Sequence, residues 1–320
     1  MNENSFLPKI EQVDRERKHF CEQFAHIEQI PFGESSFEAW DIKPLEQTKE
    51  TPVIFIPGWG KTPRSYEDTL YEFVKAGRRV ITLSMPTQDT QLDEVHTSVY
   101  PTAQANRADA ILTLLAAKGL GEADVIAHSE GCINLAIAAE RSPQVFRHFV
   151  LISPPDLTEK ESRFGIMRQA GKNTQIAKEE MNAMEKKIKE GQASELEKAQ
   201  YGTEKTRYQQ GEKDTKLWLK KRGLIKGLWE SMNSIVTRHV WQNMKSKGEH
   251  GISIVSGADD EMVSMKKLQT KNAEGLGVDG FYSVAGGHDR IAIRPEQYSY
   301  LAEQALSALE KKYSTVNTRL

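Results

Sequence analysis

The sequence predicts an α/β protein with a mostly parallel central sheet flanked by helices. Short apolar runs, which are typical of strands buried on both faces, alternate with segments of helical periodicity. A strand, a helix and a second strand in succession form a βαβ unit, and such units build parallel sheets. The alternation stops after residue 155 and resumes near residue 250, which indicates an insertion into the sheet domain.

The amino-terminal stretch predicts two features that precede the main sheet. Residues 1–25 carry apolar side chains at helical spacing among many charges and predict a helical appendage. Two strand-like pieces follow, at 26–30 and 37–42, and the residues between them include proline, glycine and serine, which favour a turn. These two pieces are therefore expected to form a hairpin.

The strands of the main sheet are expected where an apolar run is too short for a helix. In chain order these runs lie at 52–57, 79–84, 123–128, 149–153, 252–257 and 280–284. Helices are expected where apolar positions recur every three or four residues, at 66–75, 105–116, 133–138, 265–272 and 295–313. Together these elements predict a core domain made of residues 26–155 and 250–320.

The expected insertion, residues 156–249, differs from the core in composition. Residues 156–250 hold twenty lysine and arginine residues against fourteen aspartate and glutamate residues, so this part is positive while the remainder is negative. Its middle has few apolar positions and predicts exposed helices. Residues 224–244 instead carry a helical stripe, with Trp229 and Trp241, that is wide enough to dock on another surface.

The composition limits the classes of partner and compartment. The chain has 320 residues, enough for one α/β domain with an insertion, and its formal net charge of -2 gives no support for nucleic acid as a partner. Cys21 and Cys132 are the two cysteines, and neither lies in a spacing typical of a metal site. No apolar run is long enough to cross a membrane. We therefore expect a soluble, cytoplasmic protein without stable membrane insertion, and the sequence identifies no protein partner.

The stretch around Ser129 carries the first candidate for catalysis. The apolar run 123–128 leads into the serine, and a helical pattern follows at once. A sharp turn between strand and helix exposes the turn residue, and the next backbone N–H, here that of Glu130, begins the helix and points where an oxyanion would form. Small residues are needed two positions to either side, where Ala127 and Gly131 stand. The segment resembles the nucleophile elbow Gly-x-Ser-x-Gly of the α/β-hydrolase superfamily, with Ala127 in place of the first glycine.

A histidine that could act as the base follows the last predicted strand. Ligand sites of parallel sheets collect at the carboxyl ends of the strands, so side chains just after strands are the candidates. His288 stands in this place, directly after Gly286 and Gly287, and the superfamily's catalytic histidine has a matching position. His128, next to the serine, is expected to point away from it and to support the turn. Five further histidines are expected on surfaces or at the flanks of strands, and His19 on the appended helix.

The carboxylate that would orient the histidine is expected after the preceding core strand. The segment Gly257 to Val263 resembles the superfamily's Gly-x-x-Asp-x-x-Val pattern, which aligns Asp260 with the catalytic acid. Its neighbours Asp259 and Glu261 better fit a solvated turn. Some members place the acid one strand earlier, and Asp156 stands at that position. The choice between Asp260 and Asp156 stays open.

Two backbone N–H groups are expected to bind the negatively charged oxygen of the transition state. The first belongs to Glu130. The second comes from the loop after the strand at 52–57, where Pro57-Gly58-Trp59-Gly60 resembles the superfamily's His-Gly-x-Gly loop with Pro57 in place of histidine. The resemblance assigns this second N–H to Trp59.

The order of serine, acid and histidine along the chain is that of the superfamily, and the insertion stands where many members carry a lid. The resemblance implies an α/β-hydrolase fold with an inserted helical lid. It also implies a serine hydrolase that cleaves an ester or related acyl bond of a small molecule through an acyl-enzyme on Ser129, with neither cofactor nor metal. Thioesterase, amidase, carbon–carbon bond hydrolase and perhydrolase activities use the same residues and stay open.

A second hypothesis is a hydrolase-fold protein that binds or senses a ligand or partner through its charged insertion. The positive charge and the tryptophan-containing stripe favour it. A pure binding protein, however, has no need of a serine, a histidine and an acid each at the end of a strand. Contact with a membrane surface through the same stripe is a further interpretation, but packing of a lid over an acyl pocket explains the same residues.

Overall fold

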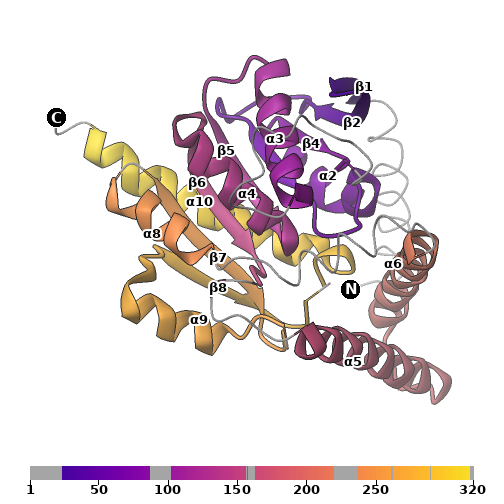
Figure 1. Cartoon of the computed structure of the whole chain (residues 1–320). Helices are drawn as coiled ribbons and strands as arrows, with labels where there is room; N and C mark the ends of the chain where they lie inside the picture. Colours follow the sequence, from indigo (N-terminus) through magenta and orange to yellow (C-terminus); the bar gives the residue numbers. More distant parts are fainter. Residues whose placement is uncertain are drawn as a thin grey trace.

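The structure is a computed structural model, and it describes residues 24–86, 102–155, 157, 163–219, 237–248, 250–260, 262–288 and 290–317. In this part of the chain eight strands form one sheet, in the order β1-β2-β4-β3-β5-β6-β7-β8 (Figure 1). The strands are β1 (Ala25–Phe32), β2 (Ser35–Ile42), β3 (Val53–Ile56), β4 (Val80–Leu83), β5 (Ala123–His128), β6 (Phe146–Ile152), β7 (Gly251–Gly257) and β8 (Gly280–Val284).

The sheet is antiparallel at one end and parallel elsewhere. β1 and β2 form the expected hairpin, in which Ile30 pairs with Phe37 and Gly33 takes a positive φ of 57° in the turn. β2 is also antiparallel to β4, whereas β4, β3, β5, β6, β7 and β8 pair in parallel. The predicted class, a mostly parallel sheet flanked by helices, is confirmed. Almost all of the appendage expected for residues 1–25 lies outside the described residues.

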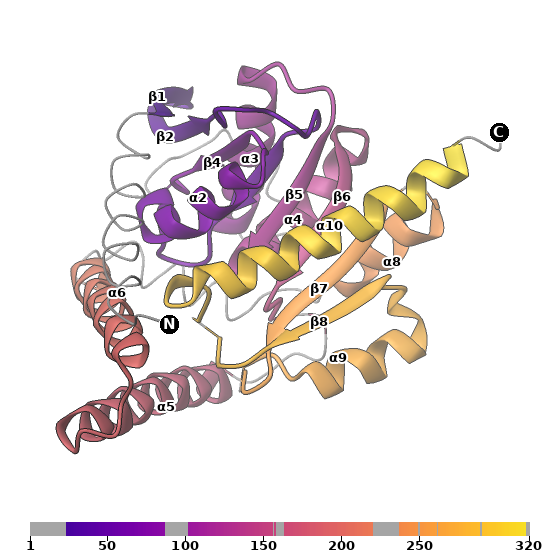
Figure 2. The ribbon, with the colours of Figure 1, turned by 180° about the vertical axis from the view of Figure 1, so that it is seen from behind.

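Helices cover both faces of this sheet (Figures 1 and 2). One face is covered by α2 (Glu67–Lys75) and α10 (Pro295–Asn317), and the other by α3 (Thr102–Ala117), α4 (Glu130–Arg141) and α8 (Arg238–Ser246). Side chains of β3 alternate between them: Val53 and Phe55 belong to the core of α2 and α10, and Ile54 and Ile56 to that of α3 and α4. The other helices of the sheet domain are α9 (Met265–Lys271) and the short helices η2 (Pro63–Tyr66), η4 (Pro143–Val145), η5 (Asn272–Leu276) and η6 (Arg290–Ala292).

Two long helices lie in the range expected for the insertion. α5 (Arg163–Lys189) and α6 (Glu195–Leu219) stand beside the sheet domain in both views (Figures 1 and 2). α8 also falls in this range, but its apolar side, with Val240, Trp241 and Met244, packs on α4 in the main core. Trp229 lies outside the described residues, and the expected limits of the insertion stay a prediction. None of the described helices is both long and apolar enough to span a membrane.

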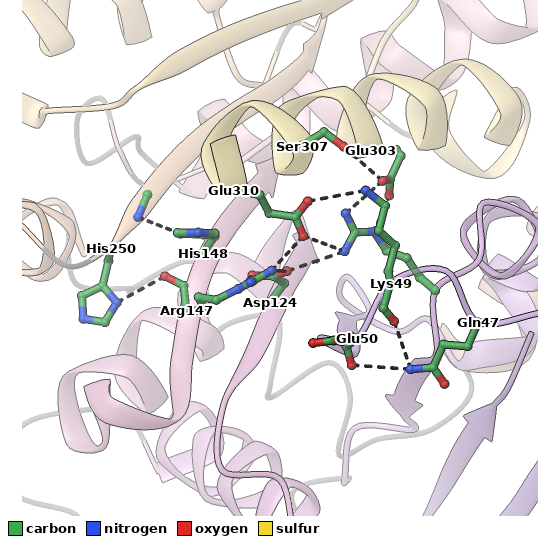
Figure 3. Close-up of polar contacts among 12 residues, drawn as sticks. Gln47, Lys49, Glu50, Asp124, Arg147, His148, His250, Glu303, Ser307 and Glu310 are labelled. Carbon is green, nitrogen blue, oxygen red and sulfur yellow. Dashed lines mark hydrogen bonds and ion pairs between the residues drawn. The ribbon is translucent and has the colours of Figure 1, made fainter. Parts of the chain in front are cut away.

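A network of charged groups holds the amino ends of the strands (Figure 3). The guanidinium of Arg78, just before β4, binds Glu303 of α10 through Nε and Nη2 at 2.5 and 2.9 Å, and Glu310 through Nη1 at 3.1 Å. Arg147 of β6 joins Glu310 at 2.8 Å and binds both oxygens of Asp124 in β5. Strands and helix are thus tied together at this edge, and the site described next lies at the opposite, carboxyl edge.

Candidate active site

Ser129 connects β5 to α4 in a strained turn. Its backbone angles are φ 52° and ψ -124°, a region that residues other than glycine seldom adopt, at a cost of roughly 1–3 kcal/mol. Gly131 makes the turn possible, because a Cβ at this position would lie 2.7 Å from the carbonyl oxygen of Pro57. Ser129 is partly exposed, although the whole of β5 before it is buried. The turn therefore presents the serine hydroxyl at the carboxyl end of the sheet.

His288, in the loop after β8, lies against Ser129. The distance between His288 Nε2 and Ser129 Oγ is 2.8 Å, and His288 Nδ1 is 3.0 Å from Oδ2 of Asp260. Because a carboxylate only accepts hydrogen bonds, Nδ1 carries a proton and Nε2 is the nitrogen that can accept one from the serine. The structure thus brings together the serine, histidine and acid that the sequence analysis named.

Asp260 is held in place from the other side by the backbone. Its Oδ1 accepts hydrogen bonds from the N–H groups of Met262 and Val263, both at 2.9 Å, and the residue is buried. Burial by itself would raise the pKa of Asp260, but the charge interaction and the hydrogen bond with His288, together with the N–H of Val263, outweigh it and hold that pKa below its usual value. The carboxylate is therefore ionised at neutral pH.

The other acidic candidates have different positions. Asp259 is exposed, as expected for a residue in a solvated turn. Asp156 and Glu261 lie outside the described residues. Among the carboxylates that the structure describes, Asp260 is the one in contact with His288.

Glu130 and Trp59 lie just after neighbouring strands. Glu130 is the first residue of α4, and its N–H is one of the four that a helix does not pair internally. Trp59 lies in the loop between β3 and η2, directly after Gly58, and β3 pairs with β5. Gly58 approaches the serine turn closely, since a Cβ there would lie 2.9 Å from Nδ1 of His128. The loop of Trp59 is thus packed against the serine turn.

Residues that sequence reasoning missed support this arrangement. The hydroxyl of Tyr66, in η2, lies 2.7 Å from Nδ1 of His128 and 3.2 Å from the N–H of Gly58. Arg107 of α3 makes a buried ion pair of 2.5 Å with the carboxylate of Glu130. Its place between apolar positions of the helix could have marked Arg107 as buried, whereas no pattern in the sequence indicates the partner of Tyr66.

The remaining histidines lie elsewhere. Of those that the structure describes, His26 and His239 are exposed, and His148 and His250 are buried near the amino end of β6; His19 and His96 lie outside the described residues. In the same part of the chain, no group of three or more histidine, cysteine, aspartate or glutamate side chains could hold a metal ion.

A cavity of about 370 Å³ lies between α5, α6 and the segment that follows His288. Its wall contains apolar and aromatic side chains, Met181, Met184 and Tyr201, and several ion pairs. The buried guanidinium of Arg290 pairs with Glu180 of α5, and Arg294 binds Glu204 of α6 at 2.9 Å. The two helices are therefore docked by charge on the segment next to the histidine.

Comparison with known proteins agrees with this architecture. A family model described as the alpha/beta hydrolase fold matches residues 51–187. The chain has the α/β-hydrolase fold. This finding confirms the superfamily that the motifs indicated. A search of curated protein sequences gave no match.

Three solved structures illustrate how this α/β-hydrolase-fold chain compares with others. A carboxylesterase structure from the thaumarchaeon Nitrososphaera gargenis superposes with a TM-score of 0.58 at 14% identity, covering 90% of this chain and 100% of that one. A bacterial membrane phospholipase A gives 0.61 at 14%, covering 95% and 92%. A bromoperoxidase from Bacillus anthracis gives 0.56 at 16%, covering 88% and 99%. At these identities the likeness shows the fold.

Proposed function

We propose that this chain is a serine hydrolase that cleaves an ester or a related acyl bond through an acyl-enzyme on Ser129. One observation carries the proposal: a chain of hydrogen bonds runs from the hydroxyl of Ser129 through the imidazole of His288 to the ionised carboxylate of Asp260. This arrangement turns a weakly nucleophilic hydroxyl into an attacking group, because the histidine takes its proton as the bond forms.

In the first half of the reaction, Ser129 Oγ attacks the acyl carbonyl and His288 Nε2 takes the hydroxyl proton. Asp260 stabilises the imidazolium that forms and keeps the ring in its orientation. Negative charge develops on the carbonyl oxygen, which accepts hydrogen bonds from the backbone N–H groups of Glu130 and Trp59. When the tetrahedral intermediate collapses, the bond to the leaving group breaks and His288 gives that group its proton.

In the second half, water replaces the leaving group. His288 Nε2 takes a proton from a water molecule, whose oxygen attacks the acyl carbon of the ester on Ser129. The same two N–H groups donate hydrogen bonds to the negatively charged oxygen of this second intermediate. Collapse of this second intermediate breaks the bond to Ser129 Oγ, which regains its proton from His288, and the acid product leaves. Every step uses side chains and backbone of this chain, so no cofactor is needed.

The neighbours in fold support a hydrolase of small acyl substrates. One solved neighbour is a carboxylesterase and another is a phospholipase A, and both of these activities act on ester bonds. In this proposal α5 and α6, beside the segment that carries His288, form part of a lid over the acyl site. A cytoplasmic location remains the prediction from the sequence.

The test is the turnover of acyl esters and thioesters of graded chain length by the wild type and by Ser129→Ala. We expect hydrolysis of at least one short-chain aryl ester by the wild type, and a loss of kcat of at least about 10⁴-fold in the variant, because the attacking oxygen is removed. Full activity of Ser129→Ala would exclude the proposal. Ser246→Ala, which removes an exposed hydroxyl on α8, is the matched control and should keep wild-type activity.

A fluorophosphonate label separates this proposal from a binding or sensing role. The reagent forms a covalent bond with an activated serine, so we expect one label per wild-type molecule and none in Ser129→Ala. A folded wild type that stays unlabelled and hydrolyses none of the esters would favour the binding protein.

The bromoperoxidase neighbour favours perhydrolysis as a second candidate activity. In that reaction hydrogen peroxide replaces water and attacks the acyl-enzyme, which gives a peracid. Peracid formation from an acetate ester and hydrogen peroxide, lost in Ser129→Ala, would support it. Release of acid alone, at a rate that peroxide does not change, would speak against it.

A further inference from the structure

His128 lies at the meeting point of three loops of the candidate site. It is the last residue of β5, next to Ser129, and it is buried. Its ring lies 5.5 Å from that of His288 between centroids. Its Nε2 is 3.3 Å from the backbone carbonyl oxygen of His288, and its Nδ1 is 2.7 Å from the hydroxyl of Tyr66. Both ring nitrogens thus have partners that come from other parts of the fold.

The chemistry of these partners fixes the direction of each hydrogen bond. A backbone carbonyl only accepts, so Nε2 of His128 carries the hydrogen and donates to His288. In a neutral imidazole the other nitrogen is then an acceptor, and the hydroxyl of Tyr66 donates to Nδ1. The Tyr66 oxygen in turn accepts from the N–H of Gly58 at 3.2 Å. A continuous chain of hydrogen bonds runs from Gly58 through Tyr66 and His128 to the backbone of His288.

The two ends of this series of hydrogen bonds belong to different parts of the proposed catalytic site. Gly58 precedes Trp59, whose N–H is one of the two groups assigned to the charged oxygen, and the other end is the backbone of the proposed base. The close approach of Gly58 to the His128 ring leaves this loop little room to shift.

We propose that His128, together with Tyr66, is a positioning residue that fixes the loop of Trp59 relative to His288. The proposal rests on the proposed function. A donor for the charged oxygen and a base must stand in one geometry in the transition state, and a displacement of either of them lowers kcat. Neither His128 nor Tyr66 touches the reacting atoms in this scheme, so their effect is exerted through Trp59 and His288.

Tyr66→Phe is the first test. It removes only the hydroxyl and keeps the aromatic ring, which packs on Phe55 with 4.9 Å between ring centroids. We expect kcat to fall by roughly tenfold to a hundredfold with little change in KM, and the rate of fluorophosphonate labelling to fall in parallel. Tyr313→Phe is the matched control: it removes a hydrogen-bonded hydroxyl at Lys245 and Asp279, far from the serine, and should leave both rates unchanged.

A second set of variants tests His128 itself. His128→Leu removes both hydrogen bonds and should lower kcat at least as much as Tyr66→Phe. His128→Gln retains a donor for the His288 carbonyl, so part of the lost kcat should return. Because the two residues act in one chain, adding Tyr66→Phe to His128→Leu should have little further effect.

The outcomes separate this proposal from a structural role and from the proposed function. Thermal unfolding of each variant identifies any that fail to fold, and Tyr66→Phe keeps the test open if His128→Leu does so. Wild-type kcat and labelling rates in folded Tyr66→Phe, or independent effects of the two substitutions, would overturn the positioning role. A wild type that neither hydrolyses esters nor takes the label would instead overturn the proposed function.

Discussion

The two oxygens of the buried Asp260 carboxylate make different contacts. Its Oδ1 is fixed by two backbone N–H groups, and its Oδ2 binds the imidazole of His288. The first contact sets the position of the side chain and the second sets the tautomer of the histidine. Because the pKa of Asp260 is lowered, its contribution to stability is complete above about pH 4, the unfolded value, and is lost as the pH falls through the folded value.

Asp260→Asn should lower kcat by about a thousandfold or more while the protein stays folded. The amide has the same shape but no charge to stabilise the imidazolium, and its N–H2 can donate to Nδ1, which forces the proton onto Nε2. Steady-state kinetics of the purified variant measure this loss. The exposed neighbour Asp259 supplies the control, since Asp259→Asn should have wild-type kcat. Wild-type kcat in Asp260→Asn would shift the role of the acid to another residue, with Asp156 the first to test.

At this scale the sequence could indicate single positions but not contacts between distant side chains. Ser129, Asp260 and His288 each follow an apolar run, and the edge of a parallel sheet gathers such residues. The link between Tyr66 and His128 spans 62 positions and depends on how η2 packs beside β5. No periodic pattern encodes that packing. The sequence could therefore predict that His128 supports the turn, but it could not predict which residues His128 binds.

Among the elements, uniform burial made two strands easy to predict. β3 and β7 are buried throughout, so their apolar runs mark them well. β6 begins at Phe146, three positions before the expected start, because Arg147 and His148 are polar and hide the beginning of the strand. Arg147 can lie there because Asp124 and Glu310 neutralise it. The local hydrophobic pattern of the sequence carries no information on such ion pairs between distant residues.

One side chain is central to the docking of α6 on the sheet domain. Arg207 donates from Nε to Asp68 of α2 at 2.7 Å, from Nη1 to the carbonyl of Ile293 at 2.9 Å, and from Nη2 to Glu296 of α10 at 3.3 Å. Its side chain is 13% exposed, so solvent screens these bonds less than it screens a surface pair. These contacts anchor α6 to α2, to α10 and to the short segment that precedes α10.

Arg207→Gln should therefore weaken the docking of α6 by about 1–2 kcal/mol. Chymotrypsin, which cleaves after aromatic residues such as Tyr201 and Tyr208, should then cut α6 roughly tenfold faster under native conditions, because local opening precedes cleavage. Lys205→Gln is the control, since Lys205 pairs with Glu185 of α5 rather than with the sheet domain, and its cleavage rate should match the wild type. Equal rates for both variants would mean that other contacts dock the helix.

In the whole molecule, the two edges of the sheet differ in backbone strain and in ion pairing. The carboxyl edge carries the strained Ser129. The amino edge is cross-linked by the charged groups that include Asp124, Arg147 and Glu310 (Figure 3), and Arg78 joins them. The attraction of Arg78, in particular, holds the pKa of Glu310 below its usual value against the effect of burial. Strained residues persist where the surrounding structure over-determines them, and the close packing of Gly131 and Gly58 at the serine turn provides such surroundings.

His148 gives this amino edge a pH dependence of its own. Burial lowers the pKa of His148 below its ordinary 6.5, and its Nδ1 accepts a hydrogen bond from the N–H of Gly251. The unfolded chain therefore binds a proton more readily than the folded one. The stabilisation is complete above about pH 6.5 and is lost progressively as the pH falls below it. Glu310 of the same network, whose pKa is lowered, responds at more acidic pH and does not obscure this window.

His148→Asn keeps an acceptor near Gly251 but cannot take up the proton in this range. We expect its thermal midpoint to be lower than that of the wild type at pH 7, since the ring packs against Tyr313, but to fall less between pH 7 and pH 5. His239→Asn, which changes an exposed histidine on α8, should show the same decline as the wild type. Differential scanning calorimetry of the three proteins over this range decides the matter. If His148→Asn declines as steeply as the wild type, the acid sensitivity of the fold resides in another group.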